Sequence, residues 1–208
     1  MTSPVPIPRV RLALIGAGIF ARDAHLPALN RRQDQFDLVA IYSRTQASAE
    51  ALAEHWRALH SSDVSPAQVE TTTDFPALLA RSDIEAVDIV LPIPVQAAAV
   101  AQALAAGKHV ISEKPIAPDR SQALSLLDLH RRHPEYVWMV AENWRYEAAF
   151  VLAAELLRAG AIGRPLLAHW AQYSPMQPGN KYYSTEWRRS GLFAGGLLLD
   201  GGALARRG

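Results

Sequence analysis

The chain has 208 residues, of which 50% are hydrophobic and 20% are charged, a composition typical of a soluble globular protein. Its formal net charge of +1 provides neither a basic surface for nucleic acid nor a polybasic face for a membrane, so neither partner is expected. The absence of cysteine excludes disulfides, a thiolate zinc site and a cysteine nucleophile.

The first 141 residues alternate between apolar segments typical of β-strands and segments with helical periodicity. This alternation predicts parallel strands joined by right-handed crossovers, and strands with nearly continuous apolar runs are buried on both faces. We therefore predict an α/β fold with one doubly wound parallel sheet. Its strands are expected at residues 10–15, 38–42, 69–72, 86–91, 109–112 and 136–140, and its helices at residues 20–30, 46–59, 75–81, 95–105 and 121–131.

The first predicted strand leads directly into Gly-Ala-Gly-Ile-Phe-Ala at residues 16–21. In a G-x-G-x-x-A turn, the first glycine allows the tight bend and the second lets a pyrophosphate approach the backbone. The small third residue lets the helix pack closely, and the N–H groups at the helix start face the phosphates. A plain strand-to-helix turn is the alternative, but the flanking strand and helix favour a dinucleotide site. Its contacts on this turn are predicted to be Gly16, Gly18, Ile19 and Phe20.

The end of the second predicted strand indicates which cofactor binds. An acidic residue there would hold the ribose 2′-hydroxyl of NAD, whereas an arginine would accept the 2′-phosphate of NADP. The chain has Ser43 and Arg44 at this point, while Asp37 lies at the start of the strand, far from the ligand edge. Ser43 and Arg44 therefore predict NADP, with NAD as the alternative. In a second interpretation, residues 43–46 form only the capping box of the next helix.

Two prolines, Pro92 and Pro94, follow the fourth predicted strand. Proline disfavours both helix and central strand, so a rigid loop is predicted over residues 91–96. This loop either lines the cofactor site, with Leu91 and Pro92 as contacts, or serves as a stiff connector.

The fifth predicted strand delivers Glu113, Lys114 and Pro115 in immediate succession. Burying a lysine ammonium is costly unless the group is paired or used, and ligands of open α/β sheets sit at the carboxyl ends of the strands. We therefore predict that Glu113 and Lys114 belong to the functional site.

These motifs together resemble the Gfo/Idh/MocA oxidoreductases, the family that includes glucose-fructose oxidoreductase and inositol dehydrogenase. The resemblance extends over residues 10–202 and implies a dinucleotide-binding Rossmann domain at residues 1–141, followed by a partial substrate or dimerisation domain at residues 142–208. The matching segments are residues 16–21, 25–29, 91–96, 106–115, 142–146, 160–163, 187–188 and 195–202.

The resemblance also implies catalytic roles. Lys114 would orient substrate and nicotinamide and help to move the hydroxyl proton. The family's site is completed by an aspartate and by a histidine four residues later. Asp200 matches the aspartate, but Leu204 occupies the histidine position, and leucine takes no proton. Arg145, after the sixth predicted strand, is a further predicted cofactor contact.

Two other features depart from the family pattern. Pro94 and Gln96 stand where members commonly carry an asparagine and a histidine, which weakens the expected nicotinamide-side contacts. From Arg164 onward there is one convincing strand, at residues 165–173, where members have a large antiparallel sheet. We therefore expect an incomplete α+β second domain of a truncated family member, with homo-oligomer contacts in a full-length form.

The expected function is an NAD(P)-dependent oxidoreductase that transfers hydride between the nicotinamide and a sugar, a polyol or a related hydroxy compound, acting on a CH–OH group. The alternative, favoured by Leu204, is a non-catalytic dinucleotide sensor or an inactive truncated product. His130 and His133 lack a third ligand, so no metal site is expected. The proline-rich N-terminus is not a signal peptide pattern and no apolar run could span a bilayer, which favours a cytoplasmic location.

Overall fold

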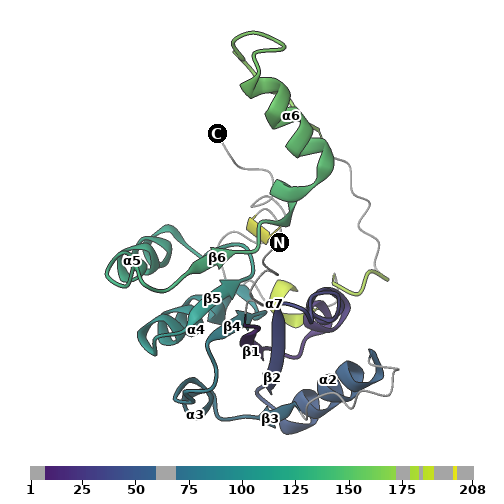
Figure 1. Cartoon of the computed structure of the whole chain (residues 1–208), viewed down its shortest axis with the longest axis vertical. Helices are drawn as coiled ribbons and strands as arrows, with labels where there is room; N and C mark the ends of the chain where they lie inside the picture. The colour runs from purple at the N-terminus through teal and green to yellow at the C-terminus, as the bar shows by residue number, and fades with distance from the viewer. Residues whose placement is uncertain (1–7, 60–68, 172–178, 183–184, 190–198, 201–208) are drawn as a thin grey trace, which may run out of the picture. The chain divides into compact units, whose positions relative to one another are not determined.

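The computed structural model describes residues 8–59, 69–171, 179–182, 185–189 and 199–200. They belong to two compact units, Met1–Val140 and Ala141–Gly208. The first unit contains a six-stranded sheet with helices on both of its faces (Figure 1).

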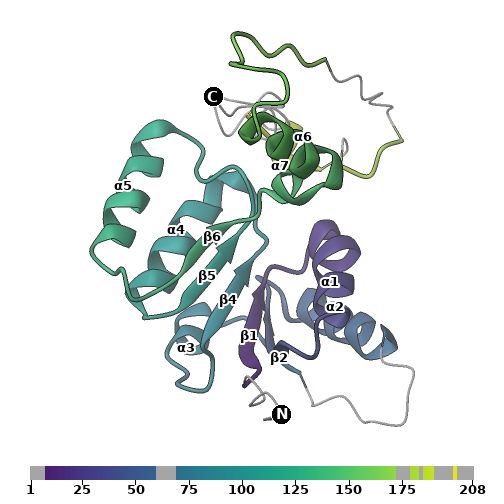
Figure 2. The same ribbon diagram turned by 45° about the horizontal axis from the view of Figure 1, so that its top comes forward.

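The sheet has the order β3-β2-β1-β4-β5-β6, and every neighbouring pair of strands is parallel (Figures 1 and 2). This arrangement confirms the predicted α/β fold with a doubly wound parallel sheet. The ends of the strands differ from the predicted ones by at most two residues. The strands are β1 (Val10–Ile15), β2 (Phe36–Tyr42), β3 (Glu70–Thr72), β4 (Ala86–Ile89), β5 (His109–Ser112) and β6 (Trp138–Val140).

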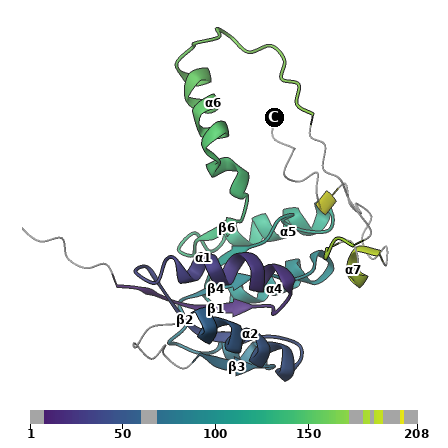
Figure 3. The same ribbon diagram turned by 90° about the vertical axis from the view of Figure 1, so that its right-hand side faces the viewer.

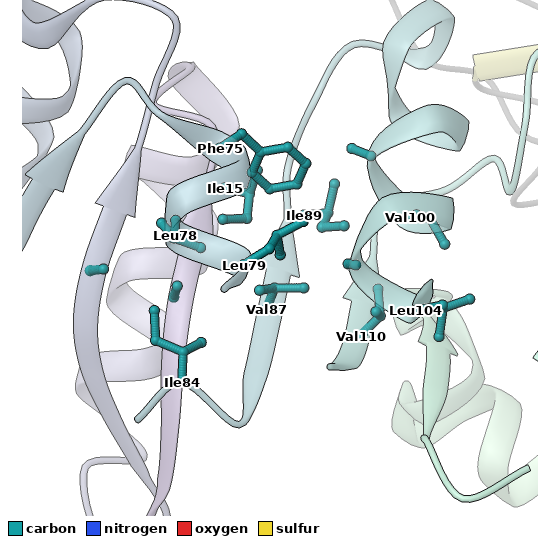
Figure 4. Close-up of a cluster of buried hydrophobic side chains, with 14 of the residues drawn as sticks. Ile15, Phe75, Leu78, Leu79, Ile84, Val87, Ile89, Val100, Leu104 and Val110 are labelled. Carbon is teal, nitrogen blue, oxygen red and sulfur yellow. The ribbon is translucent and has the colours of Figure 1, made fainter. Parts of the chain in front are cut away.

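Helices cover both faces of the sheet and form a separate apolar core on each. One core packs the sheet against α3, α4 and α5, and Figure 4 shows side chains of this core from α3, α4 and the strands. The other packs the sheet against η1, α1 and α2, and α2 lies beside the edge strand β3 (Figures 1 and 3). The helical segments are η1 (Ala21–His25), α1 (Leu26–Asn30), α2 (Gln46–Leu59), α3 (Phe75–Leu79), α4 (Ile93–Ala105) and α5 (Arg120–Arg131).

The central strand β1 supplies both cores, which explains its apolar run from Leu12 to Ile15. Ala13 and Ile15 face the core with α3 and α4, whereas Leu14 faces the core with α1 and α2, and all three are completely buried. Successive side chains of a strand point to opposite faces, so a strand covered on both faces buries apolar side chains on each of them, and in β1 the polar Arg11 is exposed near the start of the strand. The register against β2 shifts by one residue after Leu12, which leaves Val39 as the extra residue of β2.

The helix predicted over residues 20–30 is interrupted. Residues 21–25 form a π-helical turn in which the N–H of Leu26 donates to the carbonyl of Ala21, five residues earlier, and an α-helix follows. Pro27 stands in the first turn of that α-helix, where its missing N–H costs no hydrogen bond. Residues 20–30 are thus helical as predicted, and the π-helical turn within them was not predicted.

The rigid loop predicted over residues 91–96 is also wrong, because α4 begins at Ile93. Pro92 is the N-cap and Pro94 lies in the first turn, whose N–H groups have no partner within a helix. Two prolines at this spacing thus start a helix rather than prevent one.

The second unit contains η2 (Asn143–Tyr146), α6 (Ala148–Arg158) and α7 (Glu186–Arg189), and its described part has no strand. Of the strand predicted at residues 165–173, residues 165–171 form no regular structure and 172–173 lie outside the described residues. Leu166 and Leu167 are 87% and 89% exposed. A strand requires a neighbour to pair its backbone groups, and none of the described residues provides one.

Candidate functional site

The carboxyl ends of the strands lie in register at one edge of the sheet. Ile15 pairs with Tyr42 and with Ile89, Ile89 with Ser112, and Ser112 with Val140, each of them the last residue of its strand. Because all pairs are parallel, the segments after these residues leave from the same edge. The strand order reverses between β1 and β4, and at such a switch point α/β proteins bind their ligands.

The glycine turn after β1 combines one crowded and one open glycine. Gly16 donates its N–H to the carbonyl of Tyr42 at 2.9 Å and has a φ of 114°, and a Cβ here would lie 2.3 Å from the carbonyl oxygen of Val90. A Cβ on Gly18 would have no atom within 4 Å. The turn therefore requires the first glycine, and the backbone at the second is open to a ligand, as a dinucleotide requires.

Ile19 and Phe20 begin the helical segment after this turn, and Phe20 is 39% exposed. Ala21, the third small residue of the motif, is completely buried beside α2 in the apolar core. The motif thus keeps its packing residue inside and leaves Gly18 and Phe20 accessible at the edge.

The segment after β2 presents Ser43 and Arg44 at the same edge. Ser43 is half-buried and donates its N–H to the carbonyl of Thr72 at 3.2 Å, and Arg44 is exposed. Thr45, not Ser43, caps α2, because its hydroxyl accepts from the N–H of Ser48. Arg44 therefore precedes the helix, and the capping-box interpretation of residues 43–46 does not hold. Asp37 lies at the opposite end of β2 beside Arg9, as expected from its position.

Leu91 and Pro92 follow β4 next to the glycine turn. A methyl group of Leu91 lies 3.2 Å from the position that a Cβ of Gly16 would take, and the carbonyl of Pro92 accepts from the N–H of Gln96 at 3.2 Å. Their predicted contact with the cofactor stays a prediction, but both lie at the switch point.

Hydrogen bonds from α4 stabilise the turn after β5. The side-chain amide of Gln96 donates to the carbonyls of Glu113 and Pro115 on either side of Lys114. The peptide bond between Lys114 and Pro115 is cis. A different lysine, Lys108, is buried at the opposite end of β5: it is 6% exposed and donates to the carbonyls of Arg81 and Ile84 at 2.6 and 2.8 Å.

Burial lowers the pKa of Lys108, and the two carbonyls give its ammonium hydrogen bonds in compensation. Lys114 is half-buried at the ligand edge. The place of Lys114 at this edge is the one that the sequence predicted, and its role toward a ligand stays a prediction.

His25 connects the glycine turn after β1 to the turn after β5 that carries Lys114, called the Lys114 turn below. The sequence alone predicted no role for His25. Its Nδ1 lies 2.7 Å from a carboxylate oxygen of Asp88 in β4, and its Nε2 lies 3.1 Å from a carboxylate oxygen of Glu113. Burial alone would lower the pKa of His25, but hydrogen bonds and charge attraction from Asp88 and Glu113 outweigh it and raise the pKa to about 10. In the sequence, His25 stands out only as part of the family-like segment 25–29, and Asp88 only as a polar residue in an apolar strand. Neither signal indicates that the two side chains meet.

Of the predicted residues of the second unit, Asp200 has a partner within that unit. The carboxylate of Asp200, which is buried, accepts from the Nε of Arg188 at 2.7 Å, and Arg188 also donates to Thr185 and lies over the ring of Trp187. Arg145 is exposed in η2. The roles of Lys114, Asp200 and Arg145 in one site stay predictions, and Leu204 lies outside the described residues.

Among the described residues, no group of three or more histidines and carboxylates is arranged to hold a metal ion. The same part of the chain contains no helix with the length and apolar character that crossing a membrane requires.

Residues 10–141 match the family model described as "Oxidoreductase family, NAD-binding Rossmann fold" for the Gfo/Idh/MocA proteins. A curated dehydrogenase of Fusarium mangiferae is 41% identical over 197 residues, which cover 93% of this chain and 55% of that protein. The chain therefore spans about half the length of this curated relative.

Solved structures agree with these matches. An oxidoreductase from Thermotoga maritima superimposes with a TM-score of 0.83 at 35% identity, over 94% of this chain and 57% of that one. A 3-ketoreductase from Actinomadura kijaniata, solved with NADP and TDP-benzene, gives a TM-score of 0.62 at 30% identity, over 74% of this chain and 43% of that one.

Proposed function

The chain belongs to the Gfo/Idh/MocA oxidoreductase family, and we propose that it binds NADP(H) for hydride transfer to or from a sugar, a polyol or a related hydroxy or keto compound. Hydride exchange is the chemistry that the nicotinamide supplies when bound. The residues of this chain bind and orient the cofactor and hold or move the proton that accompanies the hydride.

One observation carries the proposal. The open glycine turn after β1 and the Lys114 turn after β5 leave the same edge of the sheet, separated by the single strand β4. An extended dinucleotide requires a backbone cradle for its pyrophosphate and a polar group beside its reactive end, both at the switch point. Gly18 provides the first and Lys114 the second in this proposal.

The preference for NADP rests on Arg44. It is exposed directly after β2, at the edge where the adenosine ribose of a Rossmann ligand lies, and the described residues place no carboxylate after that strand before α2. A guanidinium pairs well with a phosphate dianion, whereas a ribose 2′-hydroxyl is normally held by an acid. The related 3-ketoreductase that was solved with NADP supports the same choice.

In the proposed reaction Lys114 holds the hydroxyl or carbonyl oxygen of the substrate and exchanges a proton with it. Its ammonium donates to that oxygen during carbonyl reduction, and its amine accepts the proton during alcohol oxidation. Asp200 and Arg145 are proposed as further site residues. The enzyme class follows the family, and the kind of substrate follows the resemblance and the related 3-ketoreductase.

A second candidate function is a dinucleotide-binding protein without turnover. It is favoured by Leu204, which stands four residues after Asp200 where a proton-transferring histidine would complete the family's site. The two candidates share the cofactor site and differ in whether a substrate is converted.

The experiment that tests the proposal is a titration of the purified chain with NADPH and with NADH, followed by melting temperature. A ligand that binds only the folded state raises the apparent stability by RT ln(1 + [L]/Kd). A larger rise with NADPH than with NADH supports both the site and Arg44. A rise without oxidation of NADPH by any keto sugar would favour the non-catalytic candidate, and no rise with either nucleotide would refute dinucleotide binding.

A further inference from the structure

Three segments that are distant in the sequence meet at one histidine. His25 ends the π-helical turn η1, Asp88 lies in β4, and Glu113 follows β5. The side chains of the three residues are 12%, 5% and 13% exposed. The imidazole thus crosses over β4, the strand that separates the glycine turn from the Lys114 turn.

The geometry favours the doubly protonated form of this ring. Both ring nitrogens point at carboxylate oxygens, at 2.7 and 3.1 Å, and a carboxylate only accepts hydrogen bonds. With both carboxyl groups ionised, two such bonds require both nitrogens to carry hydrogen, which makes the ring an imidazolium. The raised pKa of His25 agrees with this state.

The imidazolium is also the charge that Asp88 depends on. The second carboxylate oxygen of Asp88 is buried and has no hydrogen-bond partner among the described residues. Removing the partner of a buried charge leaves that charge uncompensated, which is costly. Asp88 therefore fixes the ring to the sheet through Nδ1, and Nε2 donates to the carboxylate of Glu113.

Contacts on both sides of the ring reach the proposed cofactor site. The ring of Phe20, on the glycine turn, packs edge-on against His25 with centroids 5.4 Å apart. Glu113 immediately precedes Lys114, and the N–H of Glu113 donates to the carbonyl of Ile89 at the end of β4. One side chain thereby contacts both turns that the proposed function needs.

We propose that His25 is a positioning residue: held by Asp88, it fixes the carboxylate of Glu113 and thereby sets the Lys114 turn relative to the glycine turn for dinucleotide binding. The inference rests on the proposed function for its ligand. The hydrogen-bonded state of the ring and its hold on the turn are independent of any ligand and can be tested without one.

The first arm of the test uses the unmodified chain. Imidazole 15N spectra at pH 8.5 are expected to show a ring with both nitrogens protonated, and this signal should vanish in H25Q. Amide hydrogen exchange at Glu113, Lys114 and Ile116 should be faster in H25Q than in the matched control H130Q, which removes the bond between His130 and the carbonyl of Tyr136. A neutral His25 ring, or unchanged exchange at these amides, would overturn the inference even if NADPH binds.

The second arm measures NADPH affinity by tryptophan fluorescence. H25Q and E113Q should each raise the Kd about tenfold, the double variant should be little worse than either, and H130Q should match the parent chain. Additive losses, or an unchanged Kd in H25Q, would refute the coupling. If the parent chain binds no NADPH, the proposed function fails, and the 15N and exchange data still decide whether His25 holds the turn.

Discussion

The side-chain amide of Gln96 donates to the carbonyl oxygen of Pro115 at 2.8 Å, from the first turn of α4 to the far side of the Lys114 turn. The same nitrogen donates to the carbonyl of Glu113 on the near side. Gln96 is 1% exposed, so neither carbonyl has water as a ready substitute. The glutamine that departs from the family pattern thus stabilises the turn that carries Lys114.

Replacing Gln96 by leucine should therefore destabilise the chain and loosen this turn. The carbonyl of Pro115, in a buried hydrogen bond, and that of Glu113, in a partly buried one, lose their donor, and an unsatisfied buried acceptor costs about 1–3 kcal/mol. Chemical denaturation should show a lower free energy of unfolding for Q96L. Q102L, an exposed glutamine on the same helix, is the matched control and should stay close to the parent chain. Equal stability of the two variants would contradict the structural role of Gln96.

Substitutions at the two glycines of the turn after β1 should affect different properties: the first the stability of the fold, the second the affinity for NADPH. G16A places a methyl group 2.3 Å from the carbonyl of Val90 at a φ of 114°, so we expect a loss of about 2 kcal/mol or more in the free energy of unfolding. G18A meets no atom within 4 Å and should fold normally. Its methyl group would instead occupy the space proposed for the pyrophosphate, so NADPH affinity should fall at least tenfold in a fluorescence titration. Normal NADPH binding by G18A would place the pyrophosphate elsewhere.

Arg44 should determine the preference between the two nucleotides. R44A is expected to weaken NADPH binding by about 10- to 100-fold, since a hydrogen-bonded charge pair contributes about 1.5–3 kcal/mol. NADH has no 2′-phosphate, so its Kd should stay unchanged, and higher salt should reduce the difference between the parent chain and R44A. R57A, an exposed arginine on α2, is the control for net charge. Parallel losses for NADPH and NADH in R44A would argue against phosphate recognition.

The sheet was predictable from the sequence because its signals are local. An apolar run such as Leu12–Ile15 is buried on both faces by a general property of parallel sheets, and the glycines that follow it mark the turn. The errors fall where a local rule has two outcomes. Pro94 breaks a helix interior but starts a helix, and residues 165–171 have strand-like side chains without a strand to pair with.

The site was predictable only in part for a different reason. Gly16, Ser43 and Glu113 directly follow strands, so their place at the edge follows from the parallel topology alone. His25 contacts residues 63 and 88 positions away, and no sequence period connects them. Such contacts depend on the exact packing of η1 over β4, which the tertiary structure determines.

The raised pKa of His25 should make the free energy of unfolding depend on pH. The pKa of His25 is about 10 in the folded chain and about 6.5 when unfolded, so folding binds a proton in between. The stabilisation is fully present below pH 6.5 and is lost as the pH rises toward 10. The groups that face the ring are Asp88 and Glu113, and Arg22 and Asp23 pair with each other on its own turn.

H25Q has no imidazole to titrate, so its free energy of unfolding should be lower than that of the parent chain. This deficit should be largest below pH 6.5 and should shrink toward pH 10. The change in the deficit is expected to be on the order of a few kcal/mol. Urea unfolding of both chains at several pH values measures it, and Q102L provides a variant whose difference from the parent chain should not depend on pH. A deficit of H25Q that is constant from pH 6 to pH 10 would mean that the ring between Asp88 and Glu113 is not an imidazolium, because a neutral ring would bind no additional proton on folding.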